Sequence, residues 1–276
     1  MPLLLKPVEA SRGTRWIGDA FRLFARKPLA FTALFSVFLF GAMVVSLVPL
    51  LGGVVQMMSL PLLSLGFMVA GQSALLDGPV HPRQFIEPLR ADPARRRALL
   101  TMCLVYGVLA LCILMLADAV SGSAWGRLQA LLAKGEAAQP EIDALLSEPG
   151  VGTAVMLALG LGTLLSIPFW HAPALVHWGG QGVRQALFSS TVAVWRSKGA
   201  FFTYAAGWVV VLLLFGVLAA MLFAVLGVPQ MAGVLGVPAG LVFSAVFYLS
   251  VLFTFNDSFG GGAPPTEAAG PAPDPA

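Results

Sequence analysis

The sequence predicts an all-α membrane protein: a polytopic bundle of six transmembrane helices, with amphipathic helices at the cytoplasmic interface. Hydrophobic residues make up 58% of the 276 positions and charged residues only 11%, and the mean hydropathy is +0.87. Soluble domains carry about 25% charged residues, so this much apolar surface must face lipid. In addition, six apolar stretches are long enough to cross a hydrocarbon core of about 30 Å.

These six stretches define the predicted domains. They lie at 29–51, 54–76, 98–117, 151–176, 201–226 and 233–255, and none contains Asp, Glu, Lys or Arg. Residues 1–28 are expected to form a cytoplasmic N-terminus with an interfacial helix, and residues 29–255 the membrane domain. The tail, 256–276, is rich in Gly, Pro and Ala and is expected to be disordered and cytoplasmic. The first stretch is too long for the core of a cleaved signal peptide, so we expect it to be retained.

Two connections have a predictable structure. Pro49, Gly52 and Gly53 interrupt the apolar run between the first two stretches, which predicts a tight hairpin there. The longer connection, 118–150, is expected to hold two short helices. One begins at a Ser123 cap, and the other carries Pro140 in its first turn.

The basic residues predict the orientation of the spans in the membrane. Residues 1–28 carry six Lys or Arg, 77–97 carry five and 177–200 carry three, whereas 118–150 carry only two. With six spans, the first three segments share one side of the membrane. Because connections rich in Lys and Arg stay in the cytoplasm, both termini are expected there.

An amphipathic helix is predicted immediately before the first span. Its polar stripe comprises Arg15, Asp19, Arg22 and Arg26. Its opposite face comprises Trp16, Ile17, Ala20, Phe21 and Phe24. A basic amphipathic helix of this kind lies in the membrane interface, and each basic residue near an anionic leaflet contributes about 1 kcal/mol. Asp19 is expected to pair with Arg15 and Arg22 along the stripe.

A basic segment leading into a span recurs along the chain. Residues 24–32, FARKPLAFT, align without gaps to residues 195–203, WRSKGAFFT, and a weaker instance runs from Arg83 to Arg97. Two interpretations stay open. In the first, the chain consists of three repeats of a surface helix followed by a membrane hairpin. In the second, any span that starts on the cytoplasmic side begins with basic and then aromatic residues. These segments supply the predicted membrane-surface binding residues, which are Arg15, Trp16, Arg22, Arg26, Lys27, Arg95, Arg96, Arg97, Trp195, Arg196 and Lys198.

The densest polar and aromatic segment is PFWHAPALVH, residues 168–177. Its two prolines are expected to kink the fourth span, and a kink frees backbone carbonyls that a ligand or ion can use. His171 and His177, together with Asp257 at the inner end of the last span, form a speculative polar cluster. The alternative is that the histidines bond carbonyls or headgroups, while Asp257 either pairs with an inner-surface arginine or ends a helix in solvent. The histidines lie about 240° apart on a regular helix, so neither a metal site nor a cofactor is expected.

Several function classes lack their signatures in this sequence. Ion-coupled transporters need ionisable residues inside the membrane, and His171 is the only such residue in the six stretches. The patterns H-E-x-x-H, P-loop and G-x-S-x-G are absent, so no metalloprotease, NTPase or hydrolase is indicated. Rows of small residues, such as Gly236, Gly240 and Ser244, predict close helix packing and allow a dimer face.

Five segments together resemble an uncharacterised family of six-span transmembrane proteins of Gram-negative bacteria. They are GTRWIGDAFRLFARKPLAF, the first hairpin, FWHAPALVHW, QALFSSTVAVWRSKGAFFTY and FTFNDSF. The resemblance covers most of residues 12–259. It implies a bacterial inner-membrane location and supplies no catalytic residues.

Three functions stay open. The favoured one is a non-enzymatic protein that organises lipid or partner proteins at the inner leaflet. Its expected partners are membrane lipids with anionic headgroups, a second copy of the chain or other membrane proteins, with no nucleic acid. The second is an uncoupled channel or facilitator for a small neutral solute. The third is an intramembrane lipid-modifying enzyme that uses His171, His177 or Asp257.

Overall fold

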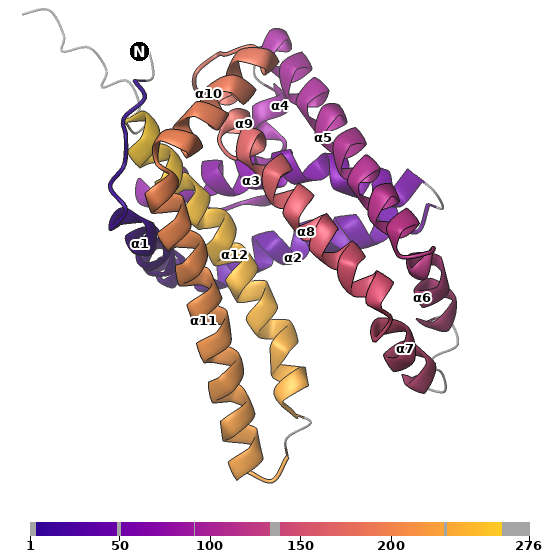
Figure 1. The fold of residues 1–276 in the computed structure, drawn as a ribbon. Helices are drawn as coiled ribbons and strands as arrows, with labels where there is room; N and C mark the ends of the chain where they lie inside the picture. Colours follow the sequence, from indigo (N-terminus) through magenta and orange to yellow (C-terminus); the bar gives the residue numbers. More distant parts are fainter. Residues whose placement is uncertain (1–3, 49–50, 91, 133–138, 229–230, 261–276) are drawn as a thin grey trace, which may run out of the picture. The chain divides into compact units, whose positions relative to one another are not determined.

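The computed structural model describes residues 4–48, 51–90, 92–132, 139–228 and 231–260, and within these ranges the chain is helical, without strands (Figure 1). Six helical segments are long and apolar enough to span a membrane: Pro28–Ser46, Gly52–Leu75, Pro93–Val120, Pro149–His177, Lys198–Val225 and Gly233–Phe259. They confirm the predicted fold class. Most of the predicted tail, residues 261–276, lies outside the described residues.

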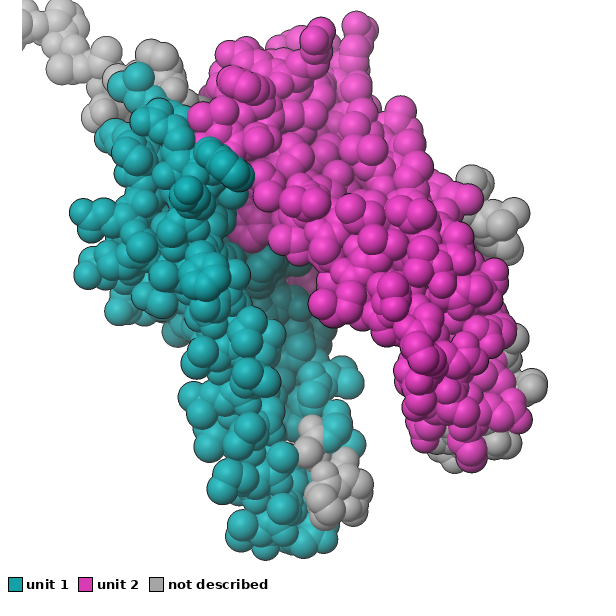
Figure 2. Space-filling view, viewed as in Figure 1, with its two compact units in different colours: residues 1–26, 193–276 teal, residues 27–192 magenta. Residues whose placement is uncertain are grey.

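The chain divides into two compact units, which Figure 2 shows in different colours. Unit 1 comprises residues 1–26 and 193–276, and unit 2 comprises residues 27–192. Unit 1 therefore joins the beginning of the chain to its last two spans. The predicted interfacial helix at the N-terminus belongs to the same unit as the last two spans.

The described residues of unit 1 include α1 (Arg12–Arg26), the end of α10 (Val183–Arg196), α11 (Lys198–Val225) and α12 (Met231–Phe259). Helix α1 packs along both α11 and α12 (Figure 1). Its buried residues are Gly13, Trp16, Ile17, Ala20, Leu23 and Phe24. The helix is amphipathic, as the sequence predicts, but its apolar face covers protein. The sequence expectation that this face enters the lipid surface is therefore corrected.

Glycine permits the close approach of α1 and α11. A Cβ atom on Gly13 would overlap the Ala200 carbonyl and the Thr203 hydroxyl of α11. A Cβ atom on Gly207 would lie 2.8 Å from Cδ1 of Ile17 on α1. A larger residue at Gly13 would meet the backbone of α11 and push the two helices apart, whereas at Gly207 the Ile17 side chain would have to move. Helix α1 is therefore built into the unit as a packed helix.

Unit 2 holds the remaining elements, with α3 at its centre. They are α2 (Pro28–Ser46), α3 (Leu51–Leu75), η1 (Pro82–Phe85), α4 (Glu87–Arg90), α5 (Pro93–Val120), α6 (Ala124–Leu132), α7 (Gln139–Leu146), α8 (Pro149–Phe169), α9 (Ala172–His177) and most of α10 (Val183–Arg196). Helix α3 contacts α2, α5, α9 and η1. The side chains of the spans are largely exposed, as expected for helices whose outer faces meet lipid.

The first hairpin turns earlier than the sequence indicates. Helix α2 ends at Ser46 and α3 begins at Leu51, so Gly52 and Gly53 lie in the first turn of α3. The N–H of Gly52 donates to the Val48 carbonyl at 2.9 Å. The chain therefore leaves the helix at Leu47, inside an apolar run in which hydropathy alone marks no boundary. Pro49 lies outside the described residues.

The connection between the third and fourth spans contains the two predicted short helices, α6 and α7. Helix α6 begins directly after Ser123, and α7 has Pro140 in its first turn. The guanidinium of Arg127 donates to both carboxylate oxygens of Glu148, at 2.9 and 2.8 Å. This contact lowers the pKa of Glu148 and raises the pKa of Arg127. Because both groups are exposed, the pair contributes little to stability.

The fourth span breaks between α8 and α9, as its prolines predict. In a regular helix the N–H of His171 would donate to the carbonyl of Ile167. Instead, the hydroxyl of buried Ser190 on α10 lies between them: it accepts from the His171 N–H at 3.0 Å and donates to the Ile167 carbonyl at 3.0 Å. These two backbone groups are taken by the protein, which corrects the expectation that a ligand or ion uses them.

Replacing Ser190 should therefore destabilise unit 2. In Ser190→Ala the buried N–H of His171 loses its acceptor, which we expect to cost about 1–3 kcal/mol of unfolding free energy. The control is Thr191→Ala, because Thr191 is exposed and bonds only the Leu187 carbonyl of its own helix at 2.8 Å. Thermal unfolding in mild detergent measures the difference. Equal midpoints for the two variants would contradict the bridging role of Ser190.

Candidate membrane-surface site

Three segments, here called the basic entry segments, each lead into a span: residues 12–27, 83–97 and 184–198. Helices α1, α4 and α10 each end at an arginine, and a span begins within three residues of each one. A positive charge in the last turn also interacts favourably with the helix dipole. This recurring order of elements is the one that the threefold-repeat interpretation requires.

Most of the predicted binding residues in these segments are exposed. The exposed ones are Arg15, Arg22, Arg26, Arg95, Arg96, Arg97, Trp195, Arg196 and Lys198. Trp195 is 71% exposed, and the Lys198 ammonium lies 5.6 Å from the centre of its ring. Such a cation–π pair keeps an aromatic ring and a charge together at the surface.

The stripe on α1 is only partly paired. Arg22, whose side chain is 80% exposed, donates to Asp19 at 2.8 Å, as predicted. The second partner of Asp19 is Arg12, at 3.7 Å, in place of the predicted Arg15. Arg15 and Arg26 make no hydrogen bond or ion pair with any residue that the structure describes. Their charges are available to a ligand outside the chain.

Two predicted binding residues of unit 2 have structural partners. The ammonium of Lys27 donates to the Gly78 carbonyl at 2.5 Å, just beyond the end of α3. The guanidinium of Arg95 donates to the carbonyl of His177, at the end of α9, at 3.1 Å. Both side chains thus hold the ends of neighbouring helices and are only partly available to lipid.

Trp16 is fully buried, so its expected place at the membrane surface is corrected. Its indole N–H donates to Oδ2 of Asp257 at 2.8 Å, and Nε of Arg12 donates to the same oxygen at 2.7 Å. The ring centroid of Trp16 lies 5.4 Å from that of Phe201 and 5.9 Å from that of Tyr204, both on α11. A buried indole N–H needs an acceptor, and the carboxylate at the end of α12 supplies one.

This contact also decides between the two sequence interpretations of Asp257: it pairs with an arginine. The hydrogen bond to Asp257 raises the pKa of Arg12. Sequence reasoning did not single out Arg12. The spacing of the two residues could have indicated it, because Arg12 lies four residues before Trp16 and therefore on the same side of the helix.

The speculative polar cluster is divided between the two units. His171 and His177 lie in unit 2, at the two ends of α9, and Asp257 lies in unit 1. His171 is fully buried, and Nδ1 of His177 has no hydrogen-bond partner among the described residues. Within the described ranges, no three His, Cys, Asp or Glu side chains are grouped in a way that could hold a metal ion.

Removing the charge of Asp257 should loosen α1. Asp257→Asn keeps an acceptor for Trp16 but deprives Arg12 of its carboxylate, and a hydrogen bond to a charged group contributes about 1.5–3 kcal/mol. We expect a loss of about 2 kcal/mol of unfolding free energy. The control is Asp19→Asn, because Asp19 pairs with Arg12 only at 3.7 Å and with the guanidinium of Arg22, which is 80% exposed. This loss should cost less than about 1 kcal/mol.

A double-mutant cycle with Arg12→Gln provides the decisive comparison for this pair. If Arg12 and Asp257 interact directly, the combined variant should lose less stability than the two single variants together. Strictly additive losses, or an Asp257→Asn variant as stable as Asp19→Asn, would show that the contact does not hold α1.

No protein-family model and no solved structure matches the chain. A "probable inner membrane protein" of Burkholderia thailandensis is 33% identical to it over 256 residues, which cover 92% of this chain and 93% of the relative. The match extends over nearly the full length of both proteins, and it confirms the resemblance to inner membrane proteins of Gram-negative bacteria. The chain therefore belongs to the family of this protein, and it is a multi-pass protein of the bacterial inner membrane.

Proposed function

We propose that this protein is non-enzymatic and that its basic entry segments bind anionic lipid headgroups at the cytoplasmic leaflet, where they gather lipid or partner proteins. The observation that carries the proposal is a set of exposed arginines that have no ion pair with any described residue. They are Arg15, Arg26, Arg83, Arg90, Arg96, Arg97, Arg184 and Arg196. All of them lie in segments that lead directly into spans, so they lie near the level of lipid headgroups.

The packing of α1 supports this role by fixing the direction of its charges. Because Trp16 and Ile17 are buried against the last two spans, the opposite stripe with Arg15, Arg22 and Arg26 is held facing outward. A preorganised set of charges loses less conformational entropy on binding than flexible side chains on a mobile segment. Near an anionic leaflet each charge contributes about 1 kcal/mol, and salt weakens this attraction.

A charge-removal variant tests the lipid-binding role. Arg15→Gln, Arg22→Gln and Arg26→Gln together should lower the preference of the protein for phosphatidylglycerol over phosphatidylcholine several-fold, since three charges near the headgroups are lost. Spin-labelled lipids in reconstituted vesicles measure this preference. The matched control replaces the same three arginines by lysine, which keeps the charge and should keep the preference.

The outcome that contradicts the proposal is an unchanged preference in the glutamine variant at low salt, where electrostatic attraction is strongest. A preference lost equally in the lysine variant would mean that the guanidinium geometry, and not the charge, recognises the lipid. Either result would require a different account of these segments.

The role also requires both termini to lie in the cytoplasm, as the distribution of Lys and Arg indicates. Green fluorescent protein fused after Ala276 should fluoresce, and alkaline phosphatase at the same position should stay inactive, because the first needs the cytoplasm and the second needs export. The same reporters inserted in the 118–150 connection should give the opposite result. Phosphatase activity at the C-terminus would invert the topology and remove the proposed cytoplasmic lipid surface.

A further inference from the structure

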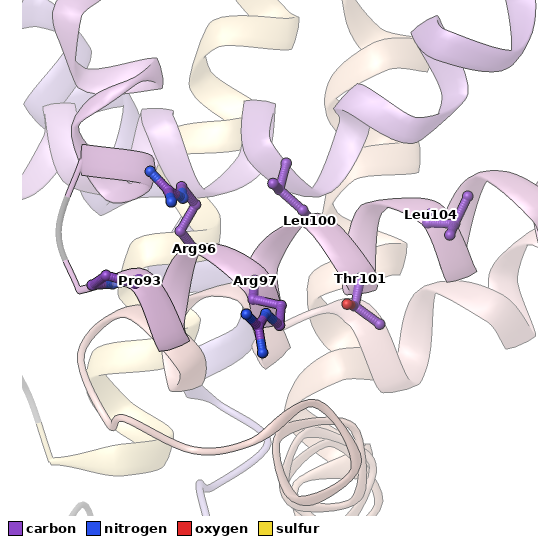
Figure 3. A pocket seen from close by; sticks show the side chains of 6 residues that line it. All are labelled: Pro93, Arg96, Arg97, Leu100, Thr101 and Leu104. Atoms are coloured by element: carbon purple, nitrogen blue, oxygen red, sulfur yellow. The ribbon is translucent and has the colours of Figure 1, made fainter.

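One face of α5 forms an open groove of about 370 Å³ in unit 2. The groove is lined by Pro93, Arg96, Arg97, Leu100, Thr101 and Leu104, as Figure 3 shows. All six come from one helix, at spacings that place them on adjoining turns. The groove therefore runs along the helix axis, from the basic entry segment into the third span.

The chemistry of this groove changes in order along its length. The two arginines stand at one end, Leu100 and Thr101 follow on the next turn, and Leu104 lies furthest into the span. The side chains of Leu100 and Leu104 are 50% and 51% exposed. From Arg97 to Leu104 the helix rises about 10 Å. That distance leads from the headgroup level into the hydrocarbon.

The polar groups of the groove are unoccupied by the protein. The guanidinium groups of Arg96 and Arg97 have no ion pair or hydrogen bond to any residue that the structure describes, in contrast to that of their neighbour Arg95, which donates to the His177 carbonyl. The Thr101 hydroxyl likewise makes no hydrogen bond within the described part of the chain. Threonines 163 and 191 instead bond carbonyls of their own helices.

We propose that this groove is a specific binding site for one anionic phospholipid. The headgroup phosphate accepts hydrogen bonds from Arg96 and Arg97, the Thr101 hydroxyl donates to an ester carbonyl, and an acyl chain lies over Leu100 and Leu104. Guanidinium groups match phosphate in charge and geometry, and the leucines offer a surface that a water-soluble phosphate cannot use. This site rests on the proposed function, because it makes one lipid of the cytoplasmic leaflet a bound ligand.

Native mass spectrometry of the delipidated full-length protein, titrated with phosphatidylglycerol and with phosphatidylethanolamine, tests the site. The wild type should bind a first phosphatidylglycerol in preference, and Arg96→Gln with Arg97→Gln should weaken that first binding step about tenfold. The matched control, Arg83→Gln with Arg90→Gln, removes two exposed charges from the same entry segment but outside the groove. It should reduce only the general attraction to anionic lipid, and it should weaken the first binding step much less than the groove variant does. Replacing Arg96 and Arg97 by lysine keeps the charges but loses the guanidinium geometry, so the affinity should lie between those of the wild type and the glutamine variant.

The outcomes separate the two proposals. If the wild type shows no preference for phosphatidylglycerol, the proposed function fails and the site fails with it. If the preference is present but survives in the Arg96→Gln, Arg97→Gln variant, only the site is wrong. If the headgroup fragment glycerophosphoglycerol displaces the lipid at equal concentration, the ligand is a small phosphodiester and the lipid assignment is overturned.

A second readout needs no variant, so it remains decisive even if a substitution impairs folding. A phosphatidylglycerol with a photoreactive acyl chain should label the α5 peptide that contains Leu100 and Leu104 in the wild-type protein. Labelling confined to the other spans would overturn the proposal.

Discussion

The carboxylate of Asp257 accepts hydrogen bonds from both Arg12 and Trp16, and this contact joins the first helix of the chain to the last. The packing of unit 1 follows from it. With the indole held on α12, its ring lies among the aromatic side chains of α11, and Gly13 and Gly207 let the two helices approach closely. The contact also sets the rotation of α1 about its axis, so that the arginine stripe must face away from the spans.

Several polar side chains elsewhere in the protein also bond backbone groups that a helix end or break leaves without a partner. Ser190 bridges the backbone where the fourth span breaks, and Lys27 and Arg95 each bind a carbonyl at a helix end. These structural uses divide the basic residues into two groups. The side chains that bond helix ends are only partly available to other ligands. The exposed side chains without a partner can bind anionic lipid.

Hydropathy and local signals were sufficient to predict much of the fold. Four features depend only on composition or on residues close in sequence. They are the six spans, the amphipathic α1, the two short helices of the 118–150 connection and the break near Pro168. The pairing of Asp257 with an arginine was one of two interpretations. The prediction for the first hairpin turn was wrong, because α2 already ends at Ser46 and Gly52 and Gly53 lie inside α3.

The remaining features depend on contacts between residues far apart in the sequence. A basic amphipathic helix has the same pattern whether its apolar face meets lipid or two neighbouring helices, so the burial of Trp16 could not be read from α1 alone. Arg95, Arg96 and Arg97 are equivalent in sequence, yet only Arg95 lies within reach of the His177 carbonyl. For the same reason, the groove on α5 became visible only when the structure distinguished occupied arginines from free ones.

The most direct test of this account is hydrogen–deuterium exchange of α1 in lipid nanodiscs, measured for the wild type and for Asp257→Asn. If α1 is a packed helix held by Asp257, the amides from Ile17 to Phe24 should exchange about as slowly as those of α11 in the wild type, and faster in the variant. Rapid exchange of α1 in the wild type, or identical exchange in both proteins, would contradict the account. In that case α1 would be a surface helix whose contacts with the last two spans do not hold it.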